Sequence, residues 1–73
     1  MATQIVMDHS GDSRHYFSRK DGKALADAER RFLDLTGKGF TAAVRTGPGV
    51  VTRIKTFDPS AEETLFFPRL VGG

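Results

Sequence analysis

Apolar and polar residues alternate in four short stretches of the chain and follow a helical period in a fifth. Residues 3–9 and 13–18 alternate on either side of a turn at Gly11, and Ile5 and Met7 share one face of the first stretch. A period of two is typical of half-buried strands. The pattern therefore predicts an opening β-hairpin.

The period changes after Asp21. Apolar residues then recur at helical spacings, which places them on one stripe of an amphipathic helix. These residues are Ala24, Leu25, Ala28, Phe32 and Leu35. Ser18 or Asp21 is expected to cap the start of this helix, and Gly37 to end it in a left-handed conformation. Arg31 is expected to face water with the other charged residues, and Leu33 lies off the stripe.

Two further strands are expected in the second half of the chain. Residues 40–45 and 50–57 alternate on either side of Gly47-Pro48-Gly49, which is a strong turn signal. The second of these strands carries Arg53 and Lys55 on one side, so we expect it to have a charged, solvated face.

A short helical turn and a last strand complete the prediction. Asp58 can cap such a turn, and Pro59 suits the first helical position that follows it. Residues 64–67 are mostly apolar and predict a buried strand. Because proline cannot donate to a strand ladder, pairing should end near Pro68.

The order strand, strand, helix, strand, strand, short helical turn, strand predicts an α+β fold. A single helix has to cover one face of a sheet in such a fold. The last strand is the most apolar, which is expected if it inserts between the first and the third strand and becomes central. We expect one folded domain over residues 1–68 and a flexible C-terminal tail over residues 69–73.

Composition excludes several classes of protein. The chain has 73 residues, too few for two lobes with a substrate cleft between them. It has no cysteine, which excludes disulfides, thiolate nucleophiles and zinc–thiolate sites. No apolar stretch approaches the roughly 20 residues that span a bilayer, and the N-terminus lacks a signal-peptide pattern. We therefore expect a cytoplasmic protein without a membrane partner.

The element order resembles the β-grasp fold of ubiquitin and of the small sulfur-carrier proteins along essentially the whole chain. The last eight residues, FFPRLVGG, are similar to the phenylalanine, proline and terminal diglycine of the small subunit of molybdopterin synthase. The longer run ETLFFPRLVGG looks like the final strand of ubiquitin, which continues into an Arg-Leu and Gly-Gly tail. The proline favours sulfur transfer, whereas Arg69 and Leu70 favour protein modification.

This resemblance implies a carrier or modifier and not an enzyme. An E1-like adenylating partner would hold ATP and magnesium, and this chain itself would bind no cofactor. Residues 69–71, that is Arg69, Leu70 and Val71, would enter that partner, and Gly72 and Gly73 would thread its channel because they lack side chains. The Gly73 carboxylate would then pass to a sulfur-receiving enzyme or to a lysine of an acceptor protein.

A basic strip is the second candidate surface. Arg45, Arg53 and Lys55 are expected on one exposed sheet face, where they would dock an acidic enzyme surface or guard a sheet edge against aggregation. The same strip, with Tyr16 or Phe57 for base stacking, would suit a β-grasp nucleic-acid-binding module. The net charge of only +2 argues against nucleic acid. A docking domain without chemistry is a further alternative.

Two histidines provide a weaker candidate. His9 and His15 flank the first turn and would approach each other across the hairpin, with Asp8 and Asp12 nearby. Such a pair can bind a metal or exchange protons, but two histidines without a clear third ligand are more often ordinary surface groups. The Gly47-Pro48-Gly49 turn does not have the spacing of a phosphate-binding loop.

Overall fold

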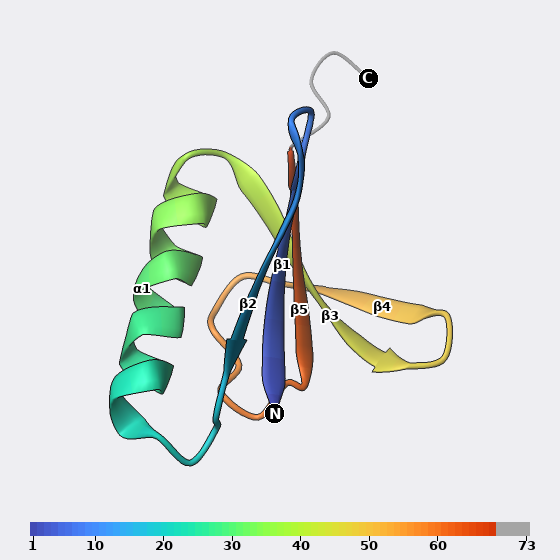
Figure 1. Cartoon of the computed structure of the whole chain (residues 1–73). Helices are drawn as coiled ribbons and strands as arrows, with labels where there is room; N and C mark the ends of the chain where they lie inside the picture. The colour runs from blue at the N-terminus through green and yellow to red at the C-terminus, as the bar shows by residue number, and fades with distance from the viewer. Residues whose placement is uncertain (69–73) are drawn as a thin grey trace.

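Five strands form one mixed β-sheet, and one helix packs across one face of it (Figure 1). The computed structural model describes residues 1–68. The elements are β1 (Ala2–Asp8), β2 (Gly11–Phe17), α1 (Gly22–Gly37), β3 (Phe40–Gly47), β4 (Val50–Ile54) and β5 (Glu63–Pro68). The fold is therefore α+β, which confirms the prediction from the order of apolar patterns.

The strand order across the sheet is β2-β1-β5-β3-β4. Strands β1 and β5 are parallel, and the other three pairs are antiparallel. The last strand is thus central, and its residues Thr64, Leu65 and Phe66 are buried. This confirms the predicted insertion of the most apolar strand, and the order of elements is β-grasp-like.

The helix begins where the sequence predicts, but the left-handed residue that follows it lies two positions later than predicted. Asp21 is the N-cap, and its side chain accepts hydrogen bonds from the backbone N–H groups of Lys23 and Ala24. Gly37, predicted to be the left-handed residue, is still helical, and the left-handed backbone occurs at Gly39, with φ +101°. Lys38 is the C-cap and closes the last turn, so the helical conformation extends through Gly37.

The core lies between α1 and the sheet. Val6, Phe32, Ala42 and Phe66 form its buried cluster. The ring of Phe32 meets those of Phe57 and Phe66 edge-on, with centroids 5.9 and 5.8 Å apart. Phe57 reaches this cluster because β4 ends at Ile54, three residues short of the predicted end of that strand. Leu33 is 60% exposed, as its position off the stripe predicts.

The connection from β4 to β5 differs from the prediction. The structure has a hydrogen-bonded turn in which the Ala61 N–H donates to the Asp58 carbonyl at 3.3 Å, and no helix is assigned there. The Asp58 carboxylate accepts hydrogen bonds from the backbone N–H and the hydroxyl of Ser60. These bonds hold the pKa of Asp58 below its usual value. The carboxylate thus caps this turn as Asp21 caps α1, but the chain enters β5 already at Glu63 and leaves no room for a further turn.

One charged residue of the helix is not solvated as predicted. Arg31 is half-buried, and its guanidinium donates to the side-chain oxygen of Gln4 at 2.6 Å. Gln4 is fully buried between β1 and α1, so its amide needs partners inside the protein.

In residues 1–68, no helix is long and apolar enough to cross a membrane.

Candidate functional site

The sheet face that α1 leaves uncovered carries one row of side chains across all five strands. We call this face the open face. The strand register places Arg14, Ile5, Leu65, Ala43 and Arg53 side by side in that order. They alternate along their strands with the residues that pack under α1, so they lie on the opposite side of the sheet. The row is apolar in its middle and has one arginine at each sheet edge.

Arg45, one of the predicted docking cations, is already paired with an acid. Its Nε lies 3.0 Å from Glu63 Oε1, between neighbouring strands β3 and β5. Both side chains are partly exposed, so the pair contributes little to stability. The pair does neutralise the positive charge of Arg45, which the sequence analysis placed on the docking surface. The predicted strip of three cations is therefore reduced to Arg53 and Lys55.

Arg53 and Lys55 flank a hollow at the outer edge of the sheet, which we call the edge notch. Its apolar lining comes from Phe40, Ala42 and Ile54, and its volume is about 370 Å³. The remaining lining residues are Thr36, Thr41, Arg53 and Lys55. Within residues 1–68, neither cation forms an ion pair. The notch thus combines an apolar floor with two positive charges and no acidic lining residue.

The notch exists because two neighbouring strands differ in extent. Strand β3 starts at Phe40, but its pairing with β4 begins only at Ala42, opposite Ile54. After Ile54 the chain bends away from the sheet, and Phe57 packs on Phe32 under the helix. The first two residues of β3 are therefore left without a β4 partner.

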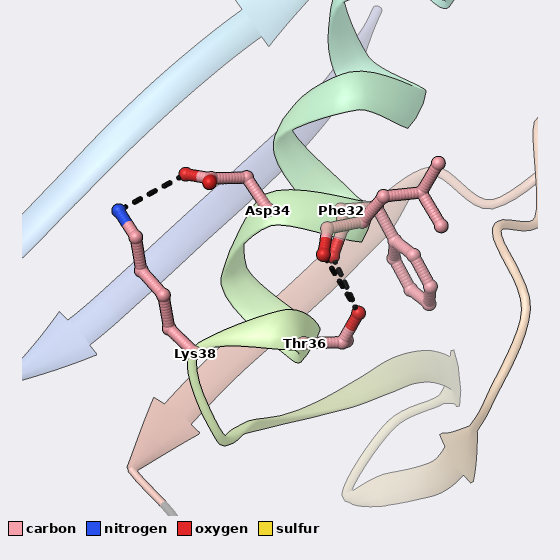
Figure 2. Close-up of polar contacts among 5 residues, drawn as sticks. Phe32, Asp34, Thr36 and Lys38 are labelled. Atoms are coloured by element: carbon pink, nitrogen blue, oxygen red, sulfur yellow. Dashed lines mark hydrogen bonds and ion pairs between the residues drawn. The ribbon is translucent and has the colours of Figure 1, made fainter.

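Thr36, in the C-terminal turn of α1, is the helix residue that lines the notch, and Figure 2 shows its hydrogen bonds. The Thr36 hydroxyl donates to the carbonyl oxygens of Phe32 and Leu33, at 2.9 and 3.3 Å. The ammonium group of Lys38 lies 3.1 Å from the Asp34 carboxylate. Neither Asp34 nor Lys38 lines the notch.

The residues assigned to carrier chemistry lie outside the described part of the chain. These are Gly72 and Gly73, together with Arg69, Leu70 and Val71, so the predicted flexible tail over residues 69–73 also lies outside it. The structure does place Pro68, which ends the central strand β5 and pairs with Phe40. The turn between β1 and β2 and the loop from α1 to β3 lie at this same end of the molecule (Figure 1).

The two histidines, the weaker candidate in the sequence, are not brought together. His9 lies in the turn after β1, whereas His15 pairs with Gln4 in the middle of the hairpin. Burial, and secondarily the nearby charge of Arg31, lower the pKa of His15 from its usual 6.5. Among the described residues, no group of three or more metal-ligating side chains occurs.

The predicted base-stacking residues differ in exposure. Tyr16 is 62% exposed and lies on the open face beside Arg14, next to Thr3 of β1. Phe57 belongs to the core and cannot stack on a ligand without leaving it. Only one of the two aromatic candidates is therefore available on the sheet.

Sequence reasoning missed Arg14 on the open-face row and the edge notch. The alternation of β2 does place Arg14 and Tyr16 on one face, but only the strand order shows that this edge lies at the far end of a row from Arg53. The notch depends on where β4 ends relative to β3. A run of β-branched residues does not show at which residue a strand ends, so the sequence could not predict this.

Comparisons with protein-family models, curated proteins and solved structures find no match to this chain. The resemblance to known proteins therefore rests on the order of the elements and of the strands in the sheet. The order β1-β2-α1-β3-β4-β5, with parallel β1 and β5 at the centre of a mixed sheet, resembles the β-grasp fold.

Proposed function

We propose that this protein is a ubiquitin-like carrier or modifier whose Gly73 carboxylate is adenylated by an E1-like enzyme. The observation that carries the proposal is the position of β5. The central strand of a β-grasp-like sheet ends at Pro68, and the sequence Arg69-Leu70-Val71-Gly72-Gly73 follows it directly. The chain is not itself an enzyme in this proposal, and ATP and magnesium belong to the activating partner.

The proposed chemistry needs little from the folded domain beyond presentation of its end. A carboxylate oxygen of Gly73 attacks the α-phosphorus of ATP, the bond to the β-phosphate breaks, and pyrophosphate leaves. Hydrosulfide or a lysine amine then attacks the acyl carbon, the bond to AMP breaks, AMP leaves, and the nucleophile gives up its proton. The partner supplies the acceleration by holding the two reacting groups in line. Two residues without side chains permit this close approach.

Two fates of the activated carboxylate remain open within the proposal. In one, Gly73 becomes a thiocarboxylate that passes sulfur to a receiving enzyme. In the other, it forms an amide with a lysine of an acceptor protein. Mass spectrometry of material from the native cells distinguishes them, with the intact protein measured for the first fate and digested acceptor proteins for the second. Exchange of one oxygen for sulfur supports the first, and branched lysine peptides that end in Gly72-Gly73 support the second.

Activation is tested by ATP–pyrophosphate exchange with E1-like enzymes from the same organism. The wild-type chain should support exchange, and a chain that lacks Gly73 should not. Because residue 73 lies five positions beyond β5, this deletion should leave the unfolding midpoint of the domain unchanged. The proposal requires that the mature chain end at Gly73, which intact mass measures directly. Absence of exchange with every such enzyme would reject it.

A nucleic-acid-binding module is the second candidate, and exposed Tyr16 beside Arg14 on the open face is the observation in its favour. The neutralised Arg45 and the buried contacts of Phe57 weigh against it. If RNA binds with a steep salt dependence, and the binding survives deletion of Gly72 and Gly73 but not Tyr16→Ala, this second candidate would replace the carrier.

A further inference from the structure

The edge notch lies at the end of the molecule that an activating enzyme has to approach. Pro68 pairs with Phe40, and Phe40 lines the notch. The last described residue of the chain therefore lies about one strand spacing, or roughly 5 Å, from a residue that lines the notch. This proximity is independent of the conformation of residues 69–73.

The side chains around the notch alternate in a defined way. Arg53, on β4, lies on the open face of the sheet, and Lys55 follows it two positions later in the chain. Ile54, between them, packs on the helix side, against the core. A cation, an apolar residue and a second cation therefore follow one another along the chain at the notch, with Ile54 on the opposite side of the sheet from Arg53 and Lys55 just beyond the end of β4.

An extended partner segment has the same alternation of side chains. Strand β4 is an edge strand with only β3 as its neighbour, so a segment can lie along its outer side. A carboxylate, a large apolar residue and a second carboxylate in such a segment would meet Arg53, the notch and Lys55 in turn. The notch volume of about 370 Å³ is large enough for one bulky apolar side chain.

We infer that the edge notch is a docking site for an extended acidic–apolar–acidic segment of the activating enzyme, with the apolar side chain in the notch. The identity of the partner rests on the proposed function. The chemistry of recognition rests on the residues that line the notch. The apolar side chain supplies burial, and the two carboxylates supply charge complementarity and orientation. Arg45 takes no part, because Glu63 already neutralises it.

The first experiment measures recognition without any enzyme. An acetylated and amidated peptide, Gly-Asp-Phe-Asp-Gly, is titrated into the full-length, isotope-labelled chain at millimolar concentration, with Gly-Lys-Phe-Lys-Gly as its control. The amide signals of Phe40, Thr41 and Ile54 should shift with the acidic peptide alone. The double variant R53E/K55E should bind it at least about tenfold more weakly. R14E is the matched control, since Arg14 is the arginine at the other end of the same row, and it should bind like the wild type.

Three results would overturn the inference: no shifts at the notch, equal shifts with the basic peptide, or an equal loss in R14E. Amide-signal dispersion and the urea midpoint verify that each variant is folded. Both reversed positions are exposed, so folding should survive the changes.

The second experiment uses the activating enzyme. In ATP–pyrophosphate exchange, R53E/K55E should raise the KM for the carrier at least about tenfold and leave kcat unchanged, because the docking contact is equal in the ground and transition states. An unchanged KM would refute docking at the notch, even if activation itself is confirmed. If no enzyme activates the wild type, the carrier proposal fails, and the peptide titration still decides whether the notch recognises this class of segment.

Discussion

Arg31 on α1 donates a hydrogen bond of 2.6 Å to the buried side-chain oxygen of Gln4 on β1. The Gln4 amide nitrogen donates in turn to the Ala28 carbonyl at 3.0 Å. Both polar ends of this glutamine are therefore satisfied, and no buried side-chain polar atom in residues 1–68 lacks a partner. The two bonds connect the middle of α1 to a specific position on β1.

The first prediction concerns this connection. Arg31→Met leaves the buried oxygen of Gln4 without a donor and should reduce the free energy of unfolding by about 1–3 kcal/mol. Gln4→Met should cost a similar amount, because it removes the acceptor for a half-buried guanidinium. The double variant should lose less than the sum of the two single losses. Urea unfolding of all four proteins measures this coupling, and strict additivity would contradict a direct interaction.

The second prediction concerns the aromatic core. Phe32 is fully buried and contacts two other rings, whereas the neighbouring Leu33 is mostly exposed. Phe32→Ala should cost about 3–5 kcal/mol, which is enough to unfold a domain of this size. Leu33→Ala should stay within about 0.5 kcal/mol of the wild type. Phe32→Leu provides a milder variant for thermal unfolding, and equal effects at positions 32 and 33 would contradict the assigned helix face.

The third prediction compares two glycines at the end of α1. Gly37 is helical, whereas Gly39 has φ +101°, which residues with a side chain rarely adopt. No atom would obstruct a methyl group at either position, so only backbone conformation distinguishes them. Gly39→Ala should destabilise the protein by about 1–2 kcal/mol. Gly37→Ala should be neutral or stabilise it by up to about 1 kcal/mol. Thermal unfolding tests the opposite signs, and a loss at Gly37 would place the helix end where the sequence predicted it.

The fourth prediction concerns pH. Burial and Arg31 lower the pKa of His15 in the folded state from its usual 6.5. As pH falls below that value, the unfolded chain therefore binds a proton before the folded chain does. The His15 contribution to stability is fully present above the unfolded pKa and decreases as pH falls toward the folded pKa. Urea midpoints measured from pH 8 to about pH 5 should decrease, and His15→Gln should reduce this slope. If His15→Gln leaves the pH dependence of the urea midpoint unchanged, that dependence comes from other titrating groups.

Local patterns predicted the elements, and the sheet order followed from the most apolar strand. The stripe of α1, its Asp21 cap and the central position of β5 were all accessible to the sequence because each depends on periodicity or on nearby residues. The bond between Gln4 and Arg31 joins positions 27 residues apart, and no local pattern encodes it. The neutralisation of Arg45 likewise depends on which strand lies beside β3.

Prediction of the candidate site was less complete for the same reason. The chemistry proposed for Gly72 and Gly73 comes from residue type and order alone, and it stays a prediction because both residues lie outside the described part of the chain. The edge notch was not predicted from the sequence, because it arises from unequal strand lengths at a sheet edge and from the chain bend after Ile54. The two candidate histidines are apart because one lies in the turn and the other in the middle of the hairpin, which spacing alone does not distinguish.

ATP–pyrophosphate exchange is the most direct test of the account. The full chain ending at Gly73, combined with an E1-like enzyme from its own organism, should exchange labelled pyrophosphate into ATP, and the chain without Gly73 should not. Exchange that persists without Gly73, or a wild-type chain that no such enzyme activates, would contradict the proposed carrier function.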